Sequence, residues 1–257
     1  MSTKKGFTLI ELLVVIAIIA LLLAILLPSL GKAKRLAQFV ICKTNLNQYS
    51  LAMGMYLNDY EDTYPSAWGN LNVSGNYGGG RPQDCRWHDE EYGPGSDPKL
   101  EGTFWPYVDA RKTHLCPTFQ RVSKTKGAGH PNHDSSISVV PQYSYSMNGI
   151  LGVSDNNPDK VKKTMVRNPS QKFLFSEENM WYSNTSTGYD AEYSRYVLND
   201  TALLVKSQNS NIVDCFGSFH KIKGSDYTTG VVNALMVDSS VITVHHKDSL
   251  KMGATVR

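Results

Sequence analysis

The chain is poor in the charge features that mark nucleic-acid-binding proteins. Its formal net charge is only +3 over 257 residues, and no run of five or more like charges occurs. Such proteins need clustered positive charge to neutralise phosphates, so the sequence gives no argument for a nucleic-acid partner. With 41% hydrophobic and 10% aromatic residues, the composition is that of a folded domain.

Recognisable enzyme motifs are also missing. The sequence contains no Gly-x-Ser-x-Gly nucleophile elbow. His220, Asp238 and Ser239 are the residue types of a hydrolase triad. The adjacent Asp238-Ser239 pair is already explained by a turn between two apolar segments. We therefore predict no catalytic residues and no enzymatic activity.

Cysteine is scarce, with four residues in the chain. Four cysteines allow three complete disulfide pairings, and the sequence does not choose among them. A bridge between Cys85 and Cys116 is the local candidate, because closing such a loop contributes about 3 kcal/mol on the chain-entropy model. The remaining two residues are Cys42 and Cys215.

The strongest feature present is an apolar run near the N-terminus. The twenty residues from Leu12 to Gly31 carry no charge, and at ~1.5 Å per residue they span a ~30 Å hydrocarbon core. A secretory signal peptide has a shorter apolar core, of roughly 7–15 residues, and small residues at a cleavage site. A plain membrane anchor fits the run, but it gives no purpose to the carboxylate of Glu11, which is costly in hydrocarbon.

The residues around Glu11 form a specific motif. Lys5-Gly-Phe-Thr-Leu-Ile-Glu-Leu-Leu-Val-Val-Ile-Ala-Ile-Ile-Ala resembles the type III signal of type IV pilins and type II secretion pseudopilins. The resemblance implies cleavage between Gly6 and Phe7, and N-methylation of the new Phe7 amine, both by prepilin peptidase. It implies that Glu11 pairs with the N-terminal amine of a neighbouring subunit, which offsets the cost of burying either charge alone. Pro28 falls where pilins commonly carry a helix-loosening proline.

The same resemblance implies a function, a location and partners. The protein is expected to be a structural subunit of a type II secretion or type IV pilus-like filament, in a homo- or hetero-oligomer with other pilin-like subunits. It is expected to cross the inner membrane once, with its N-terminus cytoplasmic and its head periplasmic, and to meet an inner-membrane assembly platform. The alternative is a membrane-anchored binding module whose loop at 66–102 recognises a substrate or polysaccharide.

Apolar periodicity extends the predicted helix beyond the membrane run. From Leu36 to Leu57, apolar residues recur at spacings of three and four, as on one buried helix face. We predict one helix from residue 8 to about residue 58 and an α+β fold, with the outer half of the helix packed on an antiparallel sheet that carries long loops. The expected divisions are a leader (1–6), a transmembrane and assembly helix (7–31), an amphipathic continuation (32–58) and a periplasmic head (59–257).

Short segments rich in β-branched and aromatic residues predict the strands of the head. A helical turn is expected at 104–108, and loops are expected at 66–102, 120–136 and 182–189. Residues 197–206 fit either a strand or a helix. The predicted strands are 136–140, 143–147, 172–177, 213–219, 231–237 and 241–245.

A second resemblance extends to the C-terminus. Cys42-Lys-Thr-Asn-Leu-Asn-Gln and Trp105-Pro-Tyr-Val are similar to segments of G-type pseudopilin-like proteins, whose C-terminal signature is a histidine, about nine residues and Asp-Gly. His220 matches the histidine and Asp238 the aspartate. Seventeen residues separate the two, however, and Ser239 replaces the glycine.

Two metal hypotheses stay open, and no other cofactor is predicted. Major pseudopilins of the type II system bind structural calcium near their C-terminal loops. The resemblance therefore implies candidate calcium ligands among Asp214, Asp226, Asp238 and Asp248. Separately, the ligand types of two close pairs suit zinc, although their spacing fits no common zinc module; the pairs are His114-x-Cys116 and His130-x-x-His133.

Overall fold

The structure is a computed structural model that describes the N-terminal helix and much of the head. The predicted strand at 136–140 and nearly all of the predicted loop at 66–102 lie outside the described residues. The described residues are 6–67, 103–108, 110–126, 143–152, 161–179, 182–184, 188–190, 202–203, 205–208, 211–213, 215–224, 229–248 and 251–252.

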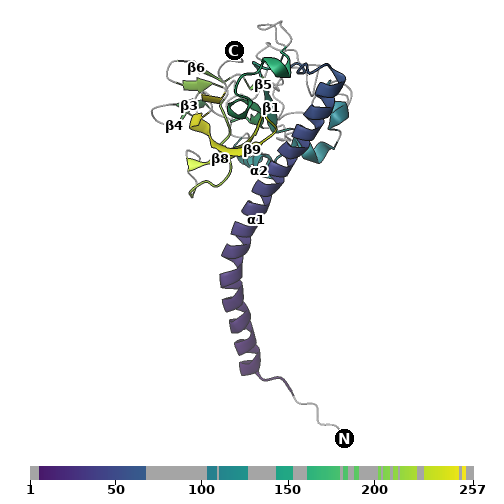
Figure 1. Ribbon diagram of the computed structural model, residues 1–257. Coiled ribbons are helices and arrows are strands. Elements are labelled where there is room, and N and C mark those ends of the chain that lie inside the picture. Colours follow the sequence, from purple (N-terminus) through teal and green to yellow (C-terminus); the bar gives the residue numbers. More distant parts are fainter. Residues whose placement is uncertain are drawn as a thin grey trace, which may run out of the picture.

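One long helix, α1 (Leu9–Asp59), runs from the N-terminal motif into the head (Figure 1). It confirms the predicted helix to within one residue at each end. Thr8 is its N-cap. The helix continues through Pro28, although a proline cannot donate the backbone hydrogen bond to the carbonyl four residues earlier.

The buried face of α1 is confined to its outer half. No residue from Gly6 to Leu36 is buried, and this part of the helix stands clear of the head in Figure 1. Leu36 and Val40, which belong to the predicted stripe, remain exposed. The buried residues recur at helical spacing, as the amphipathic pattern predicts; they are Phe39, Cys42, Asn45, Leu46, Tyr49, Ala52, Met53, Tyr56 and Leu57.

The outer half of α1 packs on an antiparallel sheet, which confirms the predicted α+β class. Four antiparallel strands are neighbours in the order β1 (Tyr145–Asn148), β2 (Phe173–Glu177), β8 (Val231–Met236) and β9 (Val241–His245). Each overlaps a predicted strand. A short strand, β5 (Ala202–Leu203), joins the β1 edge in parallel, within the segment that fitted either strand or helix.

The turn between β8 and β9 is the one that Asp238-Ser239 predicts. Oδ1 of Asp238 accepts hydrogen bonds from the backbone N–H of Ser240, at 2.9 Å, and from its hydroxyl, at 2.6 Å. Ser239 has a φ of 75°, in the left-handed region. This explains why the turn needs short polar residues, which hydrogen-bond their own backbone.

Three local predictions are wrong. The segment expected to be a loop at 182–189 forms a hairpin of β3 (Tyr182–Asn184) and β4 (Gly188–Asp190), in a second sheet with β7 (Asn211–Val213) and β6 (Lys206–Gln208). Residues 215–219 lie outside any strand, where a strand from 213 to 219 was predicted. The expected loop at 120–136 begins as a helix, α2 (Pro117–Lys126). The hairpin is polar, and the only large apolar side chains in α2 are Phe119 and Val122, so neither segment contains the apolar run by which a strand or a helix is identified from sequence.

The remaining short helices connect these elements. The predicted helical turn at 104–108 is confirmed as η3 (Trp105–Tyr107). The others are η4 (Arg111–His114), η6 (Lys163–Met165), η7 (Pro169–Gln171) and η10 (His246–Asp248).

Both faces of the main sheet are buried, because side chains alternate along each strand. In β2, a register shift between Phe173 and Phe175 interrupts this alternation, so that Phe175 faces the cluster that includes the buried side of α1 and Phe173 faces a second cluster. In β8, Leu235 and Met236 divide in the same way. The sheet therefore separates two apolar cores, and α1 covers only one of them.

Tyr49 is the centre of the core beneath α1. It is fully buried, and its ring packs against Phe175 at 4.9 Å between centroids, Tyr145 at 5.4 Å and Phe104 at 5.6 Å. Its hydroxyl lies 2.6 Å from Nδ1 of His114. The other ring nitrogen of His114 lies 2.7 Å from a backbone carbonyl, to which it must donate. In the neutral imidazole, Nδ1 therefore accepts from the Tyr49 hydroxyl.

We expect Tyr49→Phe to destabilise the head by about 1–3 kcal/mol, because it takes a hydrogen-bond donor from a buried imidazole nitrogen while keeping the ring contacts. Chemical denaturation monitored by circular dichroism measures this free energy of unfolding. Tyr60→Phe is the matched control, since Tyr60 is 47% exposed. Equal stabilities of the two variants would contradict the importance of this bond.

The head makes a pH-dependent contribution to its own stability through His246, a buried residue at the start of η10. Burial, with smaller effects from His245 and Lys247, lowers its pKa from 6.5 to about 4. The unfolded chain therefore binds this proton first as the pH falls, so stability is lost between pH 6.5 and about 4. We expect a loss of about 2–3 kcal/mol over this range, relative to His246→Gln. Urea titrations of both proteins at several pH values measure the difference, and parallel pH profiles would contradict it.

Candidate functional site

The residues of the predicted cleavage site lie at the exposed start of the chain's described part. Gly6 and Phe7 precede α1 in non-helical conformation, and Phe7 is 70% exposed. Apart from Gly6 itself and its two chain neighbours, no atom of the described residues lies within 4 Å of the position that a Cβ on Gly6 would occupy. A substitution at Gly6 therefore meets no steric obstacle within the folded chain, and any effect on processing has to arise elsewhere.

Glu11 closes the first turn of α1 through a capping box with Thr8. Its Oε2 accepts hydrogen bonds from the Thr8 backbone N–H, at 2.8 Å, and from the Thr8 hydroxyl, at 2.7 Å. The Thr8 hydroxyl oxygen in turn accepts from the Glu11 N–H at 3.3 Å. The carboxylate is thus held at the N-terminal end of the helix, where the helix dipole favours negative charge, four residues from the predicted new N-terminus at Phe7.

The inner half of α1 presents an apolar surface on all sides. By length and composition, this helix could cross a membrane, and none of its most apolar stretch is buried against the head. Exposed large side chains continue past the uncharged run, as Leu36, Val40 and Ile41. Monomeric soluble proteins rarely expose so large an apolar surface, so this half of the helix needs lipid or protein around it.

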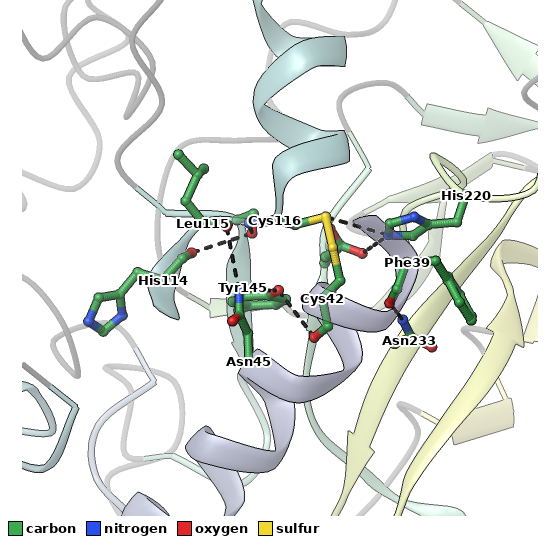
Figure 2. Close-up of a disulfide and its surroundings, with 11 residues drawn as sticks. Phe39, Cys42, Asn45, His114, Leu115, Cys116, Tyr145, His220 and Asn233 are labelled. Carbon is green, nitrogen blue, oxygen red and sulfur yellow. Dashed lines mark hydrogen bonds and ion pairs between the residues drawn. A yellow bond between two sulfur atoms is a disulfide. The ribbon is translucent and has the colours of Figure 1, made fainter. Parts of the chain in front are cut away.

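A disulfide ties α1 to the rest of the head. Cys42 on α1 is bonded to Cys116, which directly precedes α2, across 74 residues of sequence (Figure 2). The suggested bridge between Cys116 and Cys85 is therefore wrong, and Cys85 itself lies outside the described residues. Local spacing favoured Cys85, whereas the packing of α1 onto the head brings Cys42 to bonding distance of Cys116.

Two buried polar side chains lie against this disulfide. Nε2 of His220 is 3.5 Å from the Cys116 sulfur and 3.1 Å from Oε2 of Glu177, the last residue of β2. The ring of Phe39 packs edge-on against His220, at 5.2 Å between centroids. Figure 2 shows His220 pointing towards the sulfurs. The C-terminal histidine of the second resemblance is therefore part of the same buried cluster as the disulfide.

Comparison with known proteins supports the resemblance of the N-terminal residues to pilins and pseudopilins. Residues 1–27 match the family described as "Prokaryotic N-terminal methylation motif". The chain is 48% identical over 56 residues to the type IV wide pilus major component PilA4 of Thermus thermophilus, a match over 22% of this chain and 43% of that protein. It is 30% identical over 89 residues to the type II secretion system core protein G of Pseudomonas aeruginosa, over 35% of this chain and 62% of that protein.

The chain is a distant homologue of type IV pilins and type II secretion pseudopilins. The matches span about half of these relatives' own lengths. No solved structure matches this pilin-like chain. The resemblance to pilins and pseudopilins that was stated from the N-terminal residues is confirmed.

The zinc hypothesis on His114 and Cys116 is wrong for that pair. Both ring nitrogens of His114 are engaged, by the Tyr49 hydroxyl and by the Val108 carbonyl, so this histidine does not offer a nitrogen to a metal. His130 and His133 lie outside the described residues.

The calcium hypothesis gains little from the described residues. Asp214 and Asp226 lie outside them, and Asp238 uses Oδ1 for its own turn. Asp248 is hydrogen-bonded to Lys251 at 3.2 Å. Calcium takes six to eight oxygen ligands, and the described part of this loop region offers no such set. Calcium therefore remains a prediction from the resemblance alone.

Of the two polar side chains that lie against the disulfide, sequence reasoning identified one and missed the other. His220 was found through the C-terminal signature, but Glu177 was read only as the end of a predicted strand. An acidic residue closing an apolar strand is unusual, because buried acids need partners. That pattern, Phe-Leu-Phe-Ser-Glu at 173–177, is the signal by which Glu177 could have been identified.

Proposed function

We propose that this protein is a structural filament subunit that is cleaved between Gly6 and Phe7, methylated at the Phe7 amine and assembled through α1. The observation that carries the proposal is the exposed apolar half of α1 together with the methylation motif at its start. A helix that is apolar on all sides can lie in a bilayer before assembly and in a bundle of like helices after assembly. The head, from residue 59 onwards, then decorates the filament.

Glu11 gives this assembly its specificity. Apolar helices gain little by associating in lipid, because the lipid tails are as apolar as the helices. In the single chain, the described partners of the Glu11 carboxylate are all on Thr8. The Phe7 amine of an incoming subunit supplies the opposite charge. Two buried charges that pair lose much of the desolvation penalty that each carries alone.

The proposal places the subunit in a defined order of events. The chain inserts with its N-terminus in the cytoplasm and its head in the periplasm, where disulfides persist. Prepilin peptidase acts at the membrane, and an inner-membrane assembly platform then extracts the mature subunit into the filament. The disulfide between Cys42 and Cys116 is consistent with a head that folds in an oxidising compartment.

We expect Gly6→Ala, in cells that contain prepilin peptidase, to leave residues 1–6 attached to nearly all chains and to leave Phe7 without a methyl group. The structure offers no obstacle to the added methyl, so the fold is preserved and only recognition by the peptidase is lost. Intact mass spectrometry of the membrane fraction measures both changes.

Gly54→Ala is the matched control, because Gly54 also has open space at its Cβ position and lies far along α1. It should be processed like the wild type. A Gly6→Ala chain that is shortened and methylated as efficiently as Gly54→Ala would refute the proposed processing.

A further inference from the structure

The four side chains around the disulfide form a compact, buried set of metal-ligand atoms. One ligand atom from each of Cys42, Cys116, Glu177 and His220 lies within 4.8 Å of the others. All four residues are at most 3% exposed. They come from α1, the residue before α2, the end of β2 and the segment before β8, so the fold converges on this point.

The cluster contains more polar chemistry than a disulfide requires. A disulfide in an apolar core needs no acid or histidine beside it. Oε1 of Glu177 nevertheless points into this fully buried place with no hydrogen-bond partner among the described residues. An unpaired buried carboxylate oxygen is costly and calls for a ligand or another explanation. The other oxygen, Oε2, is hydrogen-bonded to His220. No described residue makes a hydrogen bond to Oε1.

We propose that Cys42, Cys116, Glu177 and His220 form a Zn²⁺ site when the disulfide is reduced. Two thiolates, one imidazole and one carboxylate are a tetrahedral ligand set that zinc accepts. Zinc–sulfur bonds of about 2.3 Å and zinc–nitrogen or zinc–oxygen bonds of about 2.0 Å imply sulfur–nitrogen separations of roughly 3.5 Å and nitrogen–oxygen separations of roughly 3.3 Å.

The observed distances already approach these values. The Cys116 sulfur is 3.5 Å from Nε2 of His220, and that nitrogen is 3.1 Å from Oε2 of Glu177. Only the two sulfurs, which are bonded to each other, have to separate, to roughly 3.8 Å in a tetrahedral site. Rotation about the cysteine side-chain bonds opens the site, and the backbone elements stay in place.

The chemistry balances with a dithiol reductant. The dithiol gives two electrons and two protons to the Cys42–Cys116 bond, which breaks into two thiols, and is itself oxidised to a disulfide. Zn²⁺ then displaces one proton from each thiol and binds both thiolates, neutral His220 and ionised Glu177. The metal replaces the covalent bond as the link between α1 and the head, so the chain has a cross-link at the same place in either redox state.

The test uses the full-length chain in detergent, reduced with a phosphine and titrated with Co²⁺ as the probe. We expect visible absorption bands typical of tetrahedral thiolate coordination, at one Co²⁺ per chain, which Zn²⁺ then abolishes by displacement. The same protein with its disulfide intact should show no such bands. Glu177→Gln and His220→Gln should each weaken binding at least about 10-fold. Cys215→Ser, which removes the buried cysteine outside the cluster, should bind like the wild type.

Two results would overturn the proposal. The first is a reduced chain that keeps its native circular dichroism and gives no bands. The second is binding that is unchanged in Glu177→Gln and His220→Gln, which would leave only an adventitious dithiol site. If reduction unfolds the head, Zn²⁺ is added during refolding of the reduced chain. Recovery of the folded spectrum in the wild type, but not in His220→Gln, supports the site, and no recovery in either refutes it.

Discussion

Glu11→Gln is expected to abolish filament assembly while leaving the first turn of α1 intact. The amide oxygen of glutamine still accepts the Thr8 hydrogen bonds that Glu11 makes, so the capping box survives. What disappears is the negative charge that, in the proposed assembly, meets the Phe7 amine of the next subunit. Leaving a buried charge without its partner costs about 3–5 kcal/mol, which corresponds to more than a 100-fold loss in the assembly constant.

Separating sheared filaments from membranes, with quantitation of the subunit in each fraction, measures this loss. Thr8→Val is the matched control, because it removes the capping hydroxyl and keeps the carboxylate. It should cost about 1 kcal/mol of helix stability and still assemble. N-terminal mass shows whether each variant was processed. Filaments of Glu11→Gln at wild-type yield would show that Glu11 acts only as a helix cap.

Reduction of the Cys42–Cys116 disulfide, with a chelator present to exclude metal, is expected to destabilise the head by about 2–5 kcal/mol. The bond closes a loop across 74 residues of sequence, for which the chain-entropy estimate is about 4–5 kcal/mol. For a head of roughly 200 residues this lowers the melting temperature by about 10 °C. Thermal unfolding with and without reductant measures the shift.

Two variants separate this effect from other thiol chemistry. The double variant Cys42→Ser, Cys116→Ser should melt at the lower temperature and no longer respond to reductant. Cys215→Ser should keep the full response, because Cys215 takes no part in this bridge. A wild-type melting temperature that does not change on reduction would contradict a stabilising role for the bond.

The local parts of this fold could be predicted from the sequence. Two sequence patterns predict the helix. The first is an uncharged apolar run, and the second is the recurrence of apolar residues every three to four positions; both depend only on neighbours along the chain. The strands β2, β8 and β9 are rich in β-branched or aromatic residues, and Asp238-Ser239 carries its own turn chemistry. The polar hairpin of β3 and β4 lacks these signals, and it is held by pairing with β7.

The buried cluster could not be predicted in the same way. The partners of the disulfide are 74 residues apart, and 43 residues separate Glu177 from His220. Nothing in the spacing of the cysteines favours Cys42 over Cys85, because the choice depends on where α1 lies on the sheet. By contrast, the motif at Gly6, Phe7 and Glu11 could be found, because its residues are near neighbours in the sequence and no long-range folding is needed to bring them together.

The place of the disulfide on α1 has a mechanical consequence. The helix stands free of the head from Leu9 to Leu36, and its first buried residues are Phe39 and Cys42. A pulling force along a filament of such helices would therefore reach the head at the first buried turn of α1. There it would act as shear between the helix and the strand β8. At that turn the disulfide resists the load together with side-chain packing. The exposed part of α1 would therefore be covalently fixed to the head at the point where the shear is greatest.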